Sequence, residues 1–262
     1  MNIDFETQNT WPNEVFNILE NNLKNILLYF NEEEIIKTKR NKDSKLREIV
    51  IFNIFRKKYE ELKNTLEILL ENHCIIGYHC TRLTQSELLN ISQNGLQILT
   101  KDLIKYKIEN AYLDGHLPDS AYHNLINDKT INDSLNNKNS HRTQKLWFCP
   151  NVSTLKDHIS VNRFFKSWGG ELIYLEKEDG VMPSLQSIGS PYIIKCAIPI
   201  KDLLKSSKQL PARFISIFVK EKIEYPEPDV EFDFFVNSDV PAQNIIDIIN
   251  HKSIEFNNLT NT

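Results

Sequence analysis

Hydrophobic residues recur every three or four positions near the N-terminus, and this spacing predicts amphipathic helices. The first helix is expected over residues 12–30, with Pro12 at its first position. Its apolar face consists of Val15, Phe16, Leu19, Leu23, Ile26, Leu27 and Phe30. A charged connector is expected at 31–43, after which Ser44 caps a second long helix. The start of that second helix is ambiguous, because residues 49–52 also fit a strand.

The pattern then changes to a strand that turns into a helix. Residues 75–78 form an apolar run, and residues 79–82 (His, Cys, Thr, Arg) are polar or reactive. Thr84 and Glu87 have the spacing of a capping box, in which each side chain bonds the backbone amide of the other residue. Gly95 suits the left-handed position that ends a helix. The sequence therefore predicts a strand, a short loop and a capped helix in succession.

The rest of the chain is predicted to alternate helices with strands. Helices are expected to begin at Thr100 and Asp119, to span 157–167, and to begin again at Pro241. The expected strands are residues 146–149, 171–175, 191–198, 214–219 and 230–236. The polar, Asn-rich segment 127–143 is expected to be a mobile loop, either a lid or an insertion without function. This order predicts an α+β fold, with a helical N-terminal region (1–72) and a sheet-containing domain (73–262).

Composition excludes some classes of protein. The chain of 262 residues is 40% hydrophobic and 25% charged, which fits one large domain or a core domain with an appendage. The net charge of −4 gives no global basic signal, so contact with nucleic acid would need a local patch. We expect no membrane partner, because no apolar run approaches 18 residues, and the N-terminus does not fit a signal peptide. The four cysteines lack CxxC spacing, which argues against zinc and disulfides and favours a cytoplasmic protein with reduced thiols.

Four stretches, in this order, resemble the ADP-ribosyltransferase fold. Tyr78-His79-Cys80-Thr81 is similar to the His-Gly-Ser/Thr motif of the poly(ADP-ribose) polymerase branch. Gln93-Asn94-Gly95-Leu96 resembles the helix ending of bacterial toxins and RNA 2′-phosphotransferases, and Leu146-Trp147-Phe148-Cys149 resembles the Ile-Tyr-Phe-Ala strand of the polymerase branch. Val230-Glu231-Phe232, followed by Val240-Pro241, looks like the strand that carries the catalytic Glu. The resemblance covers residues 75–250 and implies a split, mixed or antiparallel sheet.

The resemblance also implies the roles of individual residues in binding NAD⁺. Glu231 would be the catalytic carboxylate, and a solvent-facing strand Glu is the alternative. Asp233 stays open as the acid, because its spacing to the following Pro is one that some toxin families use. His79 would hydrogen-bond a ribose hydroxyl, unless it is a histidine satisfied within the core. Thr81 would bond the nicotinamide amide, and Arg82 would pair with a pyrophosphate oxygen.

Further cofactor contacts are expected from aromatic residues and from the strand that carries His79. Cys80 stands where the family has a Gly, although its backbone amide can still serve. No stacking Tyr is evident, so another aromatic side chain would fill that place or supply the platform for nicotinamide. Core packing is the alternative for every one of these side chains. The candidates are Tyr78, Phe148, His158, Phe164, Phe165 and Trp168.

The implied activity is that of an NAD⁺-dependent mono-ADP-ribosyltransferase, a glycosyltransferase that uses NAD as co-substrate. Such an enzyme would be a bacterial toxin or an anti-phage (antiviral) defence effector, with RNA, DNA or protein as acceptor and RNA preferred. An antitoxin would be a natural regulatory partner, and no metal is expected. Two alternatives remain. One is an RNA 2′-phosphotransferase, for which Arg82 and Arg163 are available, and the other is a non-catalytic protein-binding module.

Overall fold

The computed structural model describes residues 1–47, 49, 51–136, 143–174, 182–203, 209–223 and 233–260. The chain forms two compact units. The first comprises Met1, Ile3–His73 and Pro199–Phe232, and the second comprises Asn2, Cys74–Ile198 and Asp233–Thr262. These units interleave along the sequence, whereas the predicted domains 1–72 and 73–262 are consecutive. In the described part of the chain, no helix is both long and apolar enough to cross a membrane.

Three helices that pack on one another form most of the first unit: α1 (Asn13–Lys42), α2 (Arg56–Leu70) and α12 (Leu210–Ile223). Short helices accompany them: η1 (Gln8–Thr10), η2 (Ser44–Arg47) and α11 (Ile200–Leu203). The first helix is confirmed, with Pro12 as its N-cap rather than its first residue.

Three predictions for this unit are wrong. The expected connector 31–43 continues α1 as far as Lys42, because its Glu and Lys residues are good helix formers. The second long helix starts at Arg56 rather than after Ser44, where the chain forms only η2. The expected strand 214–219 lies in α12, where every side chain of that run is buried. A helix buried on all sides shows no amphipathic period, so its sequence looks like that of a buried strand.

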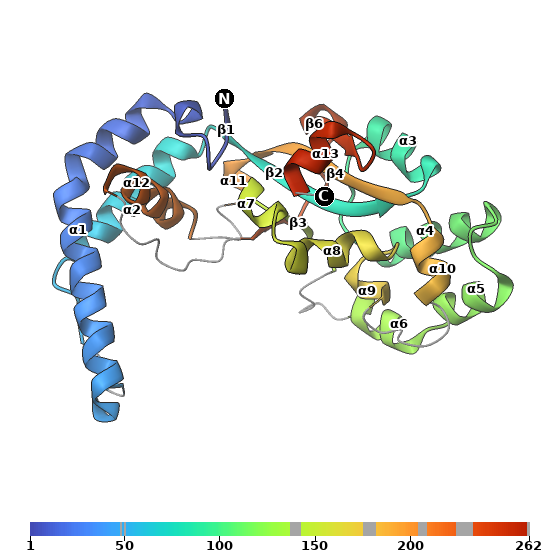
Figure 1. The fold of residues 1–262 in the computed structure, drawn as a ribbon, viewed down its shortest axis with the longest axis horizontal. Coiled ribbons are helices and arrows are strands. Elements are labelled where there is room, and N and C mark those ends of the chain that lie inside the picture. The colour runs from blue at the N-terminus through green and yellow to red at the C-terminus, as the bar shows by residue number, and fades with distance from the viewer. Residues whose placement is uncertain are drawn as a thin grey trace. The chain divides into compact units, whose positions relative to one another are not determined.

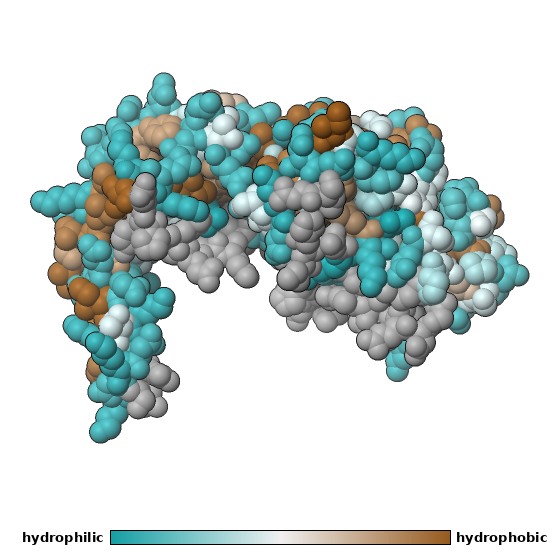
Figure 2. Space-filling model, in the orientation of Figure 1, coloured by the Kyte–Doolittle hydropathy of each residue, from teal (hydrophilic) through white to brown (hydrophobic). Residues whose placement is uncertain are grey.

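The helical unit also exposes several large apolar side chains, and brown areas along α1 are visible in Figure 2. The exposed residues of this unit include Ile35, Ile49, Phe52, Ile54 and Ile68, with exposed fractions between 47% and 77%. Single exposed apolar residues are common on protein surfaces, so these side chains alone do not define an interaction site.

A four-stranded sheet has the strand order β1-β2-β4-β6 (Figure 1), and most of its residues belong to the second unit. Its strands are β1 (Asn2–Ile3), β2 (Cys74–Leu83), β4 (Ser190–Pro199) and β6 (Ile245–Asn250). A separate antiparallel pair consists of β3 (Leu146–Phe148) and β5 (Phe234–Val236). An antiparallel bridge between Tyr78 and Cys149 links β2 to the segment that follows β3. Helices and antiparallel strands in one chain agree with the predicted α+β class.

The helices of the second unit are α3 (Gln85–Asn94), α4 (Lys101–Leu113), α5 (Asp119–Ile126), α6 (Lys129–Asn136), α7 (Val152–Leu155), α8 (His158–Lys166), α9 (Glu171–Tyr174), α10 (Met182–Ser187) and α13 (Ile254–Thr260). The capping box of Thr84 and Glu87 is confirmed, as are the helices that begin after Thr100 and at Asp119. Helix α8 confirms the prediction for 157–167, and β3 and β4 confirm the strands expected there.

Other predictions for the second unit are corrected by the structure. Helix α6 occupies part of the expected loop 127–143, of which residues 137–142 lie outside the described residues. The expected strand 171–175 is helical over α9. The expected helix after Pro241 is instead a 3₁₀ turn, η3 (Ala242–Asn244), followed by β6, which pairs with β4. Four Ile residues in β6 favour a strand, because β-branched side chains pack well on a pleated sheet.

Gly77 lies where β2 passes close to the β3–β5 pair. A β-carbon at Gly77 would lie 2.6 Å from Cζ of Phe234 and 3.0 Å from Cβ of Phe148. We expect Gly77→Ala to lower the free energy of unfolding by about 1–3 kcal/mol, because one added methyl group overpacks this contact. Urea titration followed by circular dichroism measures the effect.

A matched control for Gly77→Ala replaces the aromatic side chain that the new methyl group would meet with a smaller one. The variant Phe234→Leu removes the Cζ atom, so the two changes together should cost less than the sum of the single changes. If the two costs simply add, close packing at Gly77 is not their cause.

Candidate functional site

A cleft of about 510 Å³ lies in the second unit, between β2, α3, α4, β3 and the segment around Trp168. This volume falls in the usual range for small-molecule and cofactor sites. Several of the residues predicted to bind NAD⁺ line it: Tyr78, His79, Cys80, Thr81, Phe148 and Trp168. The structure therefore brings most of the described candidates to one site.

His79 lines the cleft, and its hydrogen bond to Trp147 defines which ring nitrogen carries the proton. Its Nδ1 lies 2.9 Å from the carbonyl oxygen of Trp147, which can only accept, so Nδ1 carries the proton. Burial lowers the pKa of His79 and Lys107 lowers it further, whereas the bond to Trp147 opposes these effects. The ring is therefore mainly neutral at neutral pH. Among the described residues, Nε2 has no hydrogen-bond partner and is available to accept a bond from a ligand.

The lowered pKa of His79 makes stability depend on pH in a known direction. Because the unfolded chain binds a proton more readily, stability is present above the ordinary histidine pKa of about 6.5 and is lost as the pH falls below it. Burial lowers the pKa of His73 and His251 in the same way. We expect His79→Asn, which keeps a donor for Trp147, to weaken the loss of stability between pH 7 and pH 5. Urea titrations across this range measure it, and equal slopes in both proteins would contradict the assignment.

Two thiols lie together in the wall of the cleft. The backbones of Tyr78 and Cys149 exchange two hydrogen bonds of 2.9 Å. The interaction with the side chain of Cys149 raises the pKa of Cys80, and burial and the nearby charge of Asp233 raise it further. Cys80 therefore stays a thiol rather than a nucleophilic thiolate. In the part of the chain that the structure describes, no three His, Cys, Asp or Glu residues are grouped to hold a metal ion.

The structure describes one of the two candidate carboxylates. Glu231 lies outside the described residues. Asp233 precedes β5, is exposed and lines the cleft. Its charge also acts on Cys80, which is the neighbour of His79 in β2. The described cleft thus combines the carboxylate of Asp233 with the imidazole of His79.

The environment of Arg82 differs from the one expected of an arginine that binds a phosphate. Its Nε donates to the carbonyl oxygen of Ile188 (3.0 Å) and its Nη1 to that of Phe165 (2.9 Å). Its Nη2 donates to the carbonyl oxygens of Gln186 (2.9 Å) and Gly189 (2.8 Å). Arg82 is also not among the described residues that line the cleft. The guanidinium therefore joins β2 to α8, to α10 and to the residues between α10 and β4.

The aromatic candidates divide between the cleft and the core. Tyr78, Phe148 and Trp168 line the cleft, but they are at most 3% exposed and so form its wall rather than an open platform. Phe165 packs on Phe256, with ring centroids 5.2 Å apart, and does not line the cleft. Its neighbour Phe164 does line it.

Two other residues were predicted to contact the cofactor, and the structure says less about them. His158 begins α8, and its side chain lies outside the described residues. Thr81 lines the cleft, and its hydroxyl makes only a long 3.5 Å contact to the carbonyl oxygen of Arg82. The Thr81 hydroxyl can therefore turn toward a ligand at little cost.

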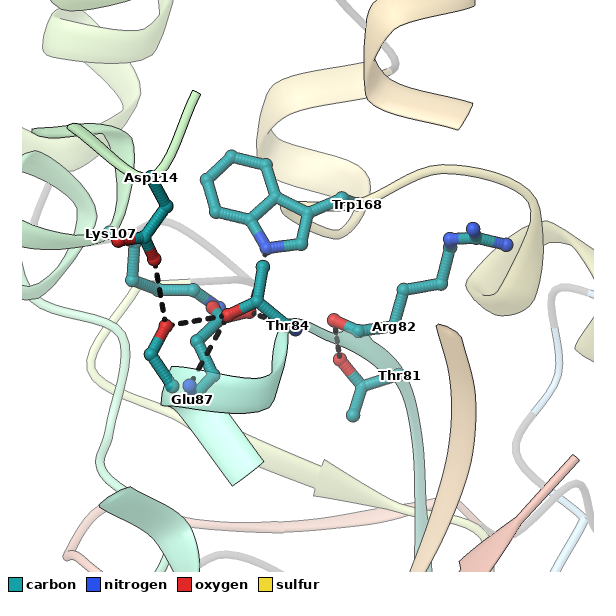
Figure 3. A network of polar contacts seen from close by, with 8 residues as sticks. Thr81, Arg82, Thr84, Glu87, Lys107, Asp114 and Trp168 are labelled. Carbon is teal, nitrogen blue, oxygen red and sulfur yellow. Dashed lines mark hydrogen bonds and ion pairs between the residues drawn. The ribbon is translucent and has the colours of Figure 1, made fainter. Parts of the chain in front are cut away.

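The sequence did not reveal a polar network that lines the same cleft (Figure 3). Oε2 of Glu87 accepts from the amide of Thr84 and from Nε1 of Trp168, both at 2.8 Å, and Oε1 lies 2.8 Å from Nζ of Lys107. Burial raises the pKa of Glu87, but Lys107 and the hydrogen bonds outweigh burial, and the net shift is downward. One signal was available: Lys107 falls on the same helical face as the buried Ile104 and Ala111.

Comparison of the chain with protein-family models, with curated proteins and with solved structures found no match.

Proposed function

We propose that the protein is an NAD⁺-dependent mono-ADP-ribosyltransferase that binds its co-substrate in this cleft. One observation carries the proposal: His79 and Asp233, from opposite ends of the second unit's sequence, line the same cleft. Both were candidates on sequence grounds. The imidazole has an acceptor nitrogen that can orient a ribose, and the carboxylate can stabilise positive charge that develops on the ribose.

The proposed reaction breaks the bond between nicotinamide and ribose. Positive charge develops on the ribose as nicotinamide leaves with the bonding electrons, and a carboxylate stabilises that charge. Asp233 is the described candidate, and Glu231 is the one implied by the resemblance. The acceptor then forms the new bond to the ribose carbon and loses a proton, for which the carboxylate is a suitable base. Nε2 of His79 accepts a hydrogen bond from a ribose hydroxyl and so orients the sugar.

The turn that follows Trp168 supports the binding of a large ligand. Gly169 and Gly170 both line the cleft and both have positive φ values, 90° and 69°. A β-carbon at Gly170 would meet no atom within 4 Å, so its backbone is open to close approach. The cleft thus offers a ligand exposed main chain beside the aromatic wall.

The biological setting is proposed from the resemblance alone. We place the enzyme among bacterial toxins or anti-phage defence effectors that act in the cytoplasm. Nucleic acid is the proposed acceptor, RNA before DNA, with protein as the other class. An antitoxin is the expected regulatory partner.

Incubation with NAD⁺ labelled in its adenylate phosphate, together with RNA, DNA or lysate protein, tests the proposal. We expect label transfer to one class of acceptor and release of an equal amount of nicotinamide. Nicotinamide release without label transfer would instead indicate an NAD⁺ hydrolase. No consumption of NAD⁺ with any acceptor would contradict the proposal.

The same assay separates the two alternatives. An RNA 2′-phosphotransferase would convert 2′-phosphorylated RNA and NAD⁺ into a cyclic phosphate of ADP-ribose. The use of Arg82 by backbone carbonyls counts against this activity, because it leaves Arg163 as the arginine among the described lining residues. A non-catalytic module would show no NAD⁺ binding by calorimetry and would retain a protein partner in pull-down.

A further inference from the structure

We infer that the ammonium group of Lys107 is the phosphate-binding group of the cleft. Lys107 projects from α4, with Nζ 2.8 Å from Oε1 of Glu87 and 5.5 Å from the centre of the Trp168 ring. The inference deepens the proposed function and rests on it, because the phosphates in question are those of NAD⁺.

Apolar packing does not explain the position of Lys107 in its helix. It lies on the face of α4 that carries Ile104, Ile108 and Ala111, all at most 2% exposed. A lysine here loses side-chain freedom and hydration that a leucine would not need to lose. Its side chain is 20% exposed and lines the cleft, so the ammonium group at its end is open to a ligand.

Glu87 orients Lys107 without using all of its donors. The Glu87 carboxylate already accepts hydrogen bonds from the Thr84 amide and the Trp168 indole, which disperse its negative charge. An ammonium group has three N–H donors, and the structure pairs that of Lys107 with a single oxygen, Oε1 of Glu87, at 2.8 Å. Because the side chain is held in place before a ligand arrives, binding costs little ordering entropy.

The surroundings fit a phosphate group joined to a ribose. His79 and Lys107 both line this cleft. A ligand whose ribose meets His79 can therefore extend its phosphates along the cleft toward Lys107. Neutral hydrogen-bonding side chains also line the cleft: Ser86, Asn90, Tyr106 and Asn110.

Two other cations line the cleft, Lys145 and Arg163. Lys145 lies with its Nζ over the ring of Phe235, 4.8 Å from the centroid. Arg163 pairs with Glu171 at 3.3 Å, and its side chain is 52% exposed, so solvent and salt screen its charge. The side chain of Lys107 is 20% exposed, so it is more enclosed than Arg163, and an enclosed charge binds phosphate more strongly.

Calorimetry with ADP-ribose as the probe tests the inference, with phosphate-free adenosine followed by ligand-observed NMR. We expect Lys107→Met to weaken ADP-ribose binding at least tenfold and to leave adenosine binding within twofold. Lys107→Arg should retain most of the affinity for ADP-ribose. Lys105→Met, an exposed position on the same helix, is the matched control and should change neither probe.

A second variant guards against misfolding, because Lys107→Met leaves the Glu87 carboxylate without its cation. Glu87→Gln combined with Lys107→Met removes both charges and should show the same selective loss. If the wild-type protein binds ADP-ribose and the folded variants bind it equally well, the inference fails and the proposed function stands. Equal weakening of adenosine also overturns the inference. If the wild-type protein binds neither NAD⁺ nor ADP-ribose, the proposed function fails and the inference fails with it.

Discussion

Replacing Arg82 with lysine is expected to lower the free energy of unfolding by about 2–4 kcal/mol. The guanidinium donates to four backbone carbonyls on segments more than 80 residues further along the chain. A lysine has three donors on one atom and cannot reproduce this fork. At least two carbonyls would lose their donor, and each such loss costs about 1–3 kcal/mol when the group is buried. Urea titration at pH 7 measures the change.

The control for Arg82→Lys is Arg163→Lys. Arg163 is half exposed and pairs with one carboxylate, so its replacement should change stability by no more than about 0.5 kcal/mol. If Arg82→Lys is as stable as the wild type but binds NAD⁺ more weakly, Arg82 contacts the pyrophosphate as the resemblance implies. In that case the structural role argued above is wrong.

Arg82 also shows where prediction from the sequence ends. The capping box of Thr84 and Glu87 could be predicted because both partners lie within one helical turn. The partners of Arg82 are carbonyl groups that every residue carries, so no sequence pattern marks them. Only the fold brings Phe165 and Gly189 to its guanidinium.

Two predictions of secondary structure were wrong for the same reason. Ile245, Ile248 and Ile249 have helical spacing, but the segment is a strand because it pairs with β4, where Ile249 lies opposite Ile193. Residues 214–219 form an apolar run in a helix that is buried on all sides. In both cases tertiary contacts decide between structures that the local pattern permits.

The polar groups of the candidate site could be predicted where a residue type and a strand position coincided. His79 and Asp233 were singled out as polar groups on predicted strands, and both line the cleft. Phe165 was singled out as an aromatic residue, but aromatic side chains fill cores more often than sites, and it packs on Phe256. Lys107 was missed because a single lysine in a helix carries no signal until the buried face of that helix is known.

Replacing Asp233 with asparagine is expected to slow nicotinamide release from NAD⁺ by about 10²–10³-fold. Asparagine has nearly the same shape but no negative charge, so it cannot stabilise the charge that develops on the ribose. The loss should appear in kcat, with KM within a few-fold, because the interaction forms mainly in the transition state. Steady-state assays of nicotinamide release measure both constants.

Two further variants decide which carboxylate acts. Asp239→Asn is the matched control from the same part of the chain, since Asp239 accepts from the amide of Ile98 at 2.8 Å and is not among the described residues that line the cleft. It should keep full activity. If Asp233→Asn is active and Glu231→Gln is not, Glu231 is the acid that the resemblance implies. If both variants keep wild-type rates, neither carboxylate stabilises the oxocarbenium-like state, and the cleft must do other chemistry, because a transferase of this kind cannot dispense with that charge.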